Sequence, residues 1–183
     1  MDRQLARIKL AHQHIRLLPQ SQRAQVFGAS KHQFLFNPVA SAAQVIAWET
    51  QNQLSLPEGY RRFILEIGDG GAGPCYGIRQ GFTPNPLSVS ADEVRLCHLP
   101  SVFVTSETLN ELPEPTDEDD MPHLRGNLML FEIGCGAEGV LVMNGPMRGH
   151  VCLTGYSDCL SGFDSPSLFL DYYEAWQQRV LLA

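Results

Sequence analysis

The sequence predicts an α+β protein, in which helices pack on a mainly antiparallel sheet within a single domain. Two helical patterns follow one another between residues 41 and 67, and three short β-compatible runs lie between residues 127 and 154. With 183 residues, of which 44% are hydrophobic, the chain is long enough for one well-buried core and shorter than two domains usually need. We therefore expect a single core.

Residues 1–25 are predicted to form a basic, helical N-terminal extension, and residues 26–183 the domain itself. Apolar side chains recur in the extension at helical spacing, and Pro19 ends this pattern. They are Leu5, Ile8, Ile15 and Leu18. Because the helix has no large aromatic anchor, we expect it to pack on its own domain and not on a membrane. After it, residues 26–28 and 33–36 are predicted to be short extended pieces.

Two amphipathic helices are expected next. Ser41 and Gln44 form a capping-box pattern, in which each side chain bonds the backbone N–H of the other residue, and a helix over 42–52 follows. Its inner face is expected to hold Val45, Ile46 and Trp48. Pro57 begins the second helix, because its fixed φ suits a first helical turn. The core stripe of the second helix consists of Tyr60, Phe63, Ile64 and Ile67.

A glycine-rich stretch, Gly68 to Gly73, follows the second helix and matches the Gly-x-Gly-x-x-Gly pattern of dinucleotide-binding proteins. In those proteins a strand precedes the glycines and a helix follows them, so that the helix N-terminus faces the pyrophosphate. Here a helix precedes the glycines, and Pro74 stands where a phosphate loop of the Walker type requires Lys. The sequence therefore favours a structural turn over nucleotide binding.

Residues 79–126 form a variable section that prolines cut into short pieces, with 94–99 and 102–105 as the better strand candidates. Between residues 107 and 120 the chain carries seven acidic side chains and no basic one. Such a block is usually a solvated loop, and the alternative is a binding surface for a basic partner.

The last third of the chain predicts a meander and a closing helix. The three predicted strands are 128–133, 139–143 and 150–154, and they form an antiparallel meander. Asp164 or Ser165 is expected to cap the closing helix, with Pro166 in its first turn. Its aromatic and apolar stripe consists of Phe169, Tyr172 or Tyr173, Trp176 and Val180.

Charge is distributed unevenly along the chain. Residues 1–32 carry +5 and the remaining residues carry −12, which gives a total of −7. A body this acidic repels nucleic acid and attracts basic partners, although it also serves simple solubility. The first residues are charged where a signal peptide needs an apolar segment, and no apolar run approaches the roughly 18 residues of a membrane span. We therefore expect a cytoplasmic protein without a membrane segment.

No pattern for catalysis or metal binding stands out. The five cysteines include no Cys-x-x-Cys pair and the six histidines are scattered, so no metal site is expected. The chain has neither a Gly-x-Ser-x-Gly elbow nor a His-Glu-x-x-His motif. We therefore expect a protein that is not an enzyme and that needs no cofactor.

Three segments of the chain resemble the SUKH superfamily, a group of bacterial immunity proteins and fungal regulators of cell-wall synthesis. They run from Leu56 to Ile78, from Gly134 to Val151 and from Phe169 to Trp176. The residues of this motif that we expect to be structural are Pro57, Tyr60, Gly70, Gly71, Gly73, Pro74, Gly134, Gly136, Asn144, Gly145, Pro146 and Trp176. Asp69 departs from the Asn that relatives often have, and Met147 from an acid. The resemblance implies an α+β fold.

The resemblance also implies binding and not catalysis, because many members of the superfamily are thought to neutralise a cognate toxin, often a nuclease. We expect a protein partner of this kind for the acidic block. The partner-binding residues would be Glu111, Glu114, Asp117, Glu118, Asp119 and Asp120. A regulatory scaffold in cell-wall or housekeeping pathways and a small-ligand-binding protein stay open as alternatives. The sequence predicts neither the identity of the toxin nor an oligomeric state.

Overall fold

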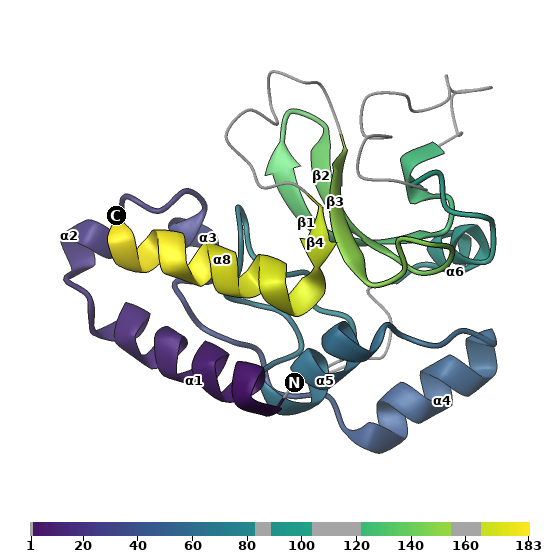
Figure 1. Ribbon diagram of the computed structural model, residues 1–183, viewed down its shortest axis with the longest axis horizontal. Helices are drawn as coiled ribbons and strands as arrows, with labels where there is room; N and C mark the ends of the chain where they lie inside the picture. Colours follow the sequence, from purple (N-terminus) through teal and green to yellow (C-terminus); the bar gives the residue numbers. More distant parts are fainter. Residues whose placement is uncertain (1, 83–88, 104–121, 155–165) are drawn as a thin grey trace.

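A four-stranded antiparallel sheet lies at the centre of the structure (Figure 1). The computed structural model describes residues 2–82, 89–103, 122–154 and 166–183. Neighbouring strands are hydrogen-bonded in chain order: β1 (Asn127–Gly134), β2 (Ala137–Val142), β3 (His150–Thr154) and β4 (Ser167–Leu168). The predicted strands 128–133, 139–143 and 150–154 are confirmed, with ends that differ by at most two residues.

Helices pack on this sheet and confirm the expected α+β class in a single domain. They are α1 (Asp2–Leu17), α2 (Gln20–Arg23), α3 (Ala29–His32), α4 (Ala42–Asn52), α5 (Glu58–Glu66), α6 (Ala91–Cys97) and α8 (Phe169–Leu182). Helices α1, α5 and α8 lie on one side of the sheet (Figure 1). Helix α6 lies away from these three helices and contacts β1. None of the described helices is long and apolar enough to cross a membrane.

Both faces of the sheet are buried. Successive residues of β2 point to opposite faces of the sheet, and they pack in two different clusters of buried side chains. Leu141 belongs to the large core cluster that includes the side chains of α5 and α8. Val140 and Val142 pack with Phe103 and Leu124 in a smaller cluster. The sheet therefore separates a main core from a second, smaller one.

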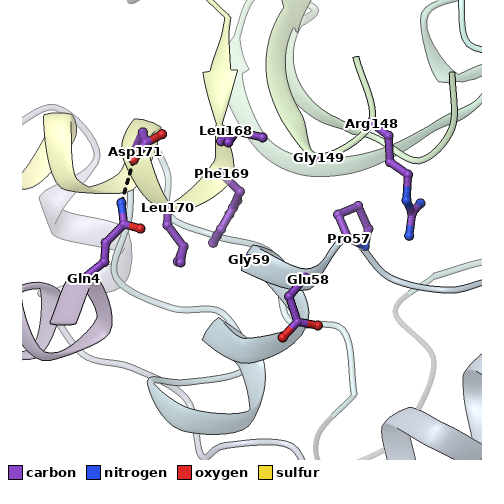
Figure 2. A pocket seen from close by; sticks show the side chains of 10 residues that line it. All are labelled: Gln4, Pro57, Glu58, Gly59, Arg148, Gly149, Leu168, Phe169, Leu170 and Asp171. Carbon is purple, nitrogen blue, oxygen red and sulfur yellow. Dashed lines mark hydrogen bonds between the residues drawn. The ribbon is translucent and has the colours of Figure 1, made fainter. Parts of the chain in front are cut away.

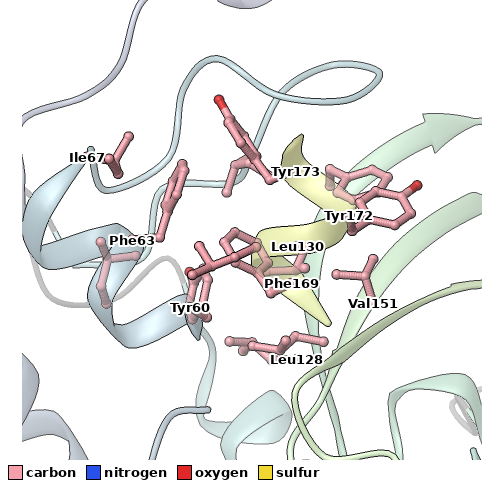
Figure 3. Close-up of a cluster of buried hydrophobic side chains, with 14 of the residues drawn as sticks. Tyr60, Phe63, Ile67, Leu128, Leu130, Val151, Phe169, Tyr172 and Tyr173 are labelled. Atoms are coloured by element: carbon pink, nitrogen blue, oxygen red, sulfur yellow. The ribbon is translucent and has the colours of Figure 1, made fainter. Parts of the chain in front are cut away.

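Aromatic side chains of α5 and α8 fill the main core (Figure 3). The ring centroid of Phe63 lies 4.8 Å from that of Tyr173 and 5.2 Å from that of Phe169. Tyr60 contacts Phe169 edge-on at 5.1 Å. Each such pair contributes about 0.5–1.5 kcal/mol beyond the apolar area that it buries. The predicted stripe is confirmed, since Tyr60, Phe63, Ile64 and Ile67 are all buried.

Helix α1 packs along α8 on its own domain, as its stripe predicts (Figure 1). Leu5, Ile8 and Ile15 are buried in the main core. The buried side chain of Gln177 donates from Nε2 to the Ile8 carbonyl oxygen at 3.0 Å. Residues 2–17 thus contribute to the same core as the rest of the chain.

Helix α4 spans the predicted residues 42–52, and its capping box is formed. The backbone N–H of Gln44 donates to Ser41 Oγ at 3.2 Å, and that of Ser41 donates to Gln44 Oε1 at 2.9 Å. Val45 and Trp48 are buried, but Ile46 is 52% exposed. Placing Ile46 on the inner face was therefore wrong, because it lies two positions from Trp48 and hence on a different face of the helix.

Several predicted elements differ from the structure. Residues 94–99 were predicted to be a strand, but α6 covers most of them. The reason is a second capping box, in which Ser90 Oγ accepts from the Glu93 N–H at 3.1 Å and Glu93 Oε2 accepts from the Ser90 N–H at 3.2 Å. Of the predicted strand 102–105, residues 102 and 103 are irregular, and the others lie outside the described part of the chain.

The predicted extended pieces and the predicted start of the closing helix also need correction. Residues 26–28 form a turn, and α3 ends where the piece 33–36 was expected to begin. Only Phe36 forms a β-bridge, with Gly71. Helix α8 begins at Phe169, so Pro166 precedes the helix because β4 comes between them. The proposed caps, 164 and 165, are outside the described residues.

The glycine-rich stretch connects α5 to the sheet by backbone hydrogen bonds. Gly71 N–H donates to the Ile78 carbonyl at 2.8 Å, and Ile78 N–H donates back to Gly71 at 2.9 Å. Ala72 N–H donates to the Leu35 carbonyl at 2.8 Å, and Arg79 N–H to that of Leu130 in β1 at 2.7 Å. Because these N–H groups are already bonded, the arrangement agrees with a structural role and offers no cradle of free donors to a phosphate.

Gly71 tests this role, because it has a φ of +96° and a side chain there would lie 2.3 Å from the Leu35 carbonyl oxygen. Gly145 is the matched control, since its φ is +74° but nothing lies near it. We expect Gly145→Ala to lower the free energy of unfolding by roughly 1–2 kcal/mol and Gly71→Ala by about 3 kcal/mol or more. If chemical denaturation shows that Gly71→Ala and Gly145→Ala lose the same free energy of unfolding, the backbone around Gly71 is not closely packed.

Two histidines, His12 and His32, are buried beside the core. His32 Nδ1 accepts a hydrogen bond from the Phe34 N–H at 3.0 Å, so the neutral ring carries its proton on Nε2. The His12 ring centroid lies 4.0 Å from that of Phe36. Burial lowers the pKa of both histidines to about 4, with smaller contributions to His12 from Arg16 and His32.

These histidines should make the protein less stable in mild acid. The folded-state pKa values of both histidines lie below the ordinary 6.5. The free energy of unfolding therefore has its full value above pH 6.5 and falls as the pH decreases towards about 4, where the buried rings must take up protons. Each histidine contributes up to roughly 3 kcal/mol to this fall. We expect His32→Asn, which keeps an acceptor for the Phe34 N–H, to reduce the fall. Urea denaturation at several pH values measures the fall in the free energy of unfolding. If this free energy depends on pH equally in the wild type and in His32→Asn, the fall does not come from His32.

Candidate functional site

A groove of about 310 Å³ lies where α5, α8 and the turn before β3 meet (Figure 2). The three segments are far apart in the sequence and each belongs to one of the three SUKH-like segments or directly adjoins it. The residues that line the groove are Gln4, Pro57, Glu58, Gly59, Arg148, Gly149, Leu168, Phe169, Leu170 and Asp171. We call this hollow the α5–α8 groove.

Two helices begin at the α5–α8 groove. Pro57 and Leu168 occupy the N-cap positions of α5 and α8, and neither has a side chain that caps the first N–H groups. Glu58 and Asp171 stand instead in the first turns, where a carboxylate compensates the helix dipole. The positive ends of both helices therefore have an acid of their own, which disfavours a free anion in this groove.

Small residues let the segments approach one another. Gly149 has a φ of +87°, and a side chain there would lie 3.5 Å from Pro57 Cβ and 3.6 Å from Leu168 Cδ2. Its carbonyl oxygen accepts from the Phe169 N–H at 3.0 Å. A side chain at Gly59 would lie 3.3 Å from Leu170 Cγ. The floor of the groove is thus held by glycine contacts and one backbone hydrogen bond.

Arg148 fixes the turn before β3 to the loop before α5. Its Nη2 donates to the Ser55 carbonyl oxygen at 2.8 Å and to Ser55 Oγ at 3.1 Å, and its Nη1 donates to the Met143 carbonyl. These bonds use the guanidinium to join two loops. Arg148 therefore acts here as a positioning residue for the wall of the groove.

The groove lining carries two acids, Glu58 and Asp171, and one arginine, Arg148, whose guanidinium bonds Ser55 and the Met143 carbonyl. Its net charge is therefore negative and suits a cationic, partly apolar group. Its floor is formed by Pro57 and by apolar side chains of residues 168–170 (Figure 2). Glu58 is exposed and makes no ion pair or hydrogen bond within the described residues, and Asp171 accepts from Gln4 Nε2 at 2.6 Å. Two carboxylates beside an apolar floor can hold a Lys or Arg side chain by its charged head and its aliphatic stem.

The lining residues of the groove include no Ser, Thr, Cys, His or Lys, and its ionisable groups are Glu58, Arg148 and Asp171. Elsewhere in the described part of the chain, no cluster of three His, Cys, Asp or Glu side chains could hold a metal ion. The exposed thiol of Cys135 and the buried thiols of Cys75, Cys97 and Cys152 lie outside the groove.

The structure places the predicted motif residues in several separate locations. Pro57 lines the α5–α8 groove, Tyr60 lies in the core below it, and Trp176 is buried on α8. Gly70, Gly71, Gly73 and Pro74 belong to the link between α5 and the sheet, and Gly134 and Gly136 form the β1–β2 turn. The six acidic residues proposed to bind a partner, from Glu111 to Asp120, lie outside the described residues.

Asn144 joins the β2–β3 turn to the segment after α6. Its Nδ2 donates to the carbonyl oxygens of Cys97 at 3.0 Å and Leu99 at 2.8 Å, and its Oδ1 accepts from the Ser101 N–H at 3.0 Å. Gly145 follows with a positive φ, and Pro146 completes the turn. This part of the motif shapes the turn whose next residues reach the groove.

Sequence reasoning did not identify Glu58, Leu168 or Asp171 as groove residues. The available signal was their position, because each lies within the first turn of a helix or just before it, in or beside a SUKH-like segment. Nothing in the sequence indicated that these two helix starts face the same hollow.

Comparison of the chain with protein-family models, with curated proteins and with solved structures finds no match in any of the three. The SUKH resemblance thus rests on the motif residues alone.

Loss of Arg148 should loosen the turn that forms the groove wall. We expect Arg148→Met to lower the free energy of unfolding by roughly 1–2 kcal/mol, because a partly exposed guanidinium loses its hydrogen bonds to two carbonyls. Arg95→Met is the control, since Arg95 is exposed and its oxygen partner on Asp92 is 3.8 Å away. If both variants unfold at the same denaturant concentration, Arg148 does not position this turn.

Proposed function

We propose that this chain is a binding protein of the SUKH type that neutralises a cognate toxin by direct contact. The partner is a protein with a basic surface, of which a nuclease domain is the favoured example. The protein acts in the cytoplasm, without catalysis and without a cofactor. The observation that carries the proposal is the α5–α8 groove, in which SUKH-like segments meet and whose lining includes two carboxylates.

The chemistry of the groove supports a basic peptide segment as its occupant. Glu58 has no competing partner within the described residues, and an apolar floor lies beside it. A Lys or Arg side chain of the partner would place its stem on Leu168, which is 50% exposed, and its charge near one of the two carboxylates. Because the helix starts are already compensated by acids, a negatively charged ligand has no advantage there.

The charge of the whole chain supports the same class of partner. Residues 33–183 carry −12, and seven acids lie between residues 107 and 120. An acidic body raises the rate of association with a basic protein by roughly 10–10³-fold at low salt. In this proposal the acidic block speeds the encounter, and the groove supplies specific contacts.

The decisive experiment measures binding to toxin domains encoded beside this gene. We expect Glu58→Lys to weaken such binding about tenfold or more, because a lysine would repel the basic side chain that the groove holds. Glu132→Lys is the matched control, since Glu132 is an exposed acid on β1, at the other end of the strand order from β4. Glu132→Lys changes the net charge by the same amount as Glu58→Lys and should leave the rate at which the toxin dissociates unchanged.

Two further results separate the parts of the proposal. Replacing Asp117, Asp119 and Asp120 by Asn should slow association and weaken its salt dependence, with little effect on dissociation. Equal effects of Glu58→Lys and Glu132→Lys would exclude the groove as the contact. If no neighbouring gene encodes a toxin that binds, the toxin proposal fails and a regulatory scaffold becomes the better interpretation.

A further inference from the structure

The N-terminal part of the chain has no acidic residues over a long distance. Between Arg3 and Trp48 there is no Asp or Glu, although the protein contains 20 acidic residues in total. The same stretch contains six of its 13 Lys and Arg residues. Its basic side chains can therefore find carboxylate partners only on other parts of the chain.

A hollow of about 480 Å³ opens within this stretch, between the end of α1, the helix α2 and the helix α3. Arg16 and Arg23 are its charged lining residues. The other lining residues are Gln20, Ala24, Ala29, Ser30, Gln33, Phe34 and Leu35. We call it the Arg16–Arg23 hollow. It shares no residue with the α5–α8 groove, so a ligand bound in it would be independent of the proposed function.

Neither arginine of this hollow has a carboxylate partner within the described residues. The Nε of Arg23 is buried and donates no hydrogen bond. Buried guanidinium donors are rarely left without an acceptor. Other arginines of the chain are paired, namely Arg7, Arg61, Arg62, Arg79 and Arg95. Arg16 and Arg23 face the same hollow.

We propose that the Arg16–Arg23 hollow binds the phosphate group of a small phosphorylated molecule. The forked N–H donors of a guanidinium match the spacing of phosphate oxygens, and two such groups line this hollow. Because the surrounding stretch has no carboxylate, no acid of that stretch competes for the two charges. Gln20, Ser30 and Gln33 offer further polar groups on the same wall.

The size and apolar part of the hollow indicate an organic phosphate. A volume of about 480 Å³ lies in the range of small-molecule sites of roughly 300–1,000 Å³ and exceeds what one phosphate group fills. Phe34 and Leu35 form an apolar part of the wall, and the Leu35 side chain is 48% exposed. The body of the ligand therefore lies against these two residues, with its phosphate between the arginines.

Phenyl phosphate is a suitable probe, because it combines a phosphate with an aromatic ring. Isothermal titration of the full chain should show binding that is about tenfold tighter for phenyl phosphate than for inorganic phosphate, and none for phenol. Arg16→Gln and Arg23→Gln should each weaken binding about tenfold or more. Lys9→Gln is the matched control, since Lys9 is exposed on α1 and does not line the hollow. It should leave the affinity within about twofold.

Other outcomes would overturn the proposal. If Lys9→Gln weakens binding as much as Arg23→Gln, the phosphate is attracted by general charge and not by this hollow. A second arm uses vesicles containing phosphatidic acid, because a lipid headgroup carries the same phosphate chemistry. Arg23-dependent binding to vesicles without binding of phenyl phosphate would assign the surface to lipid and would refute a small-molecule site. Circular dichroism of each variant verifies that it is folded.

Discussion

The contact between the aromatic side chains of α8 and those of α5 is the interaction on which the rest of the structure depends. Phe63 of α5 packs against both Phe169 and Tyr173 of α8, with ring centroids 5.2 and 4.8 Å away (Figure 3). On its other sides α8 holds α1 through Gln177 and the sheet through Tyr172, which stacks on Phe131 of β1 at 6.0 Å. The α5–α8 groove lies where these two helices begin, so its shape follows from this packing.

Local sequence signals were sufficient to predict the helices that have both a recognisable N-terminal signal and an apolar stripe. Helix α4 was predicted from its capping box, and α5 from Pro57 and its apolar stripe. Helix α6 was not predicted, although Ser90 and Glu93 form the same kind of box, because residues 94–99 were interpreted as a strand candidate between prolines. The capping bonds and the burial of Glu93 decide in favour of the helix.

The segment after α3 could not be predicted from local preference. Gln33 and Phe34 both have a positive φ angle, which residues other than glycine rarely adopt. The Phe34 N–H is held by His32, and its ring packs against Trp176 of α8. Such a conformation is imposed by tertiary contacts, so the sequence pattern pointed instead to an extended piece.

The candidate site was predictable only in part for the same reason. Pro57 and Arg148 belong to SUKH-like segments, but about 90 positions separate them, and only the folded chain brings them to one groove. Glu58 and Asp171 became candidates once both helix starts were seen to face that groove. The acidic block remains a prediction from charge, because it lies outside the described residues.

The glycine-rich link has one more effect, on how another protein can approach the sheet. A strand with a free edge invites a foreign strand to pair with its backbone. On β1, however, the Leu130 and Glu132 carbonyls already accept from Arg79 and Tyr76, at 2.7 and 3.4 Å. At the other end of the strand order, β4 is only two residues long among the described residues. Among the described residues, the fold thus offers no long free strand edge for edge-to-edge association.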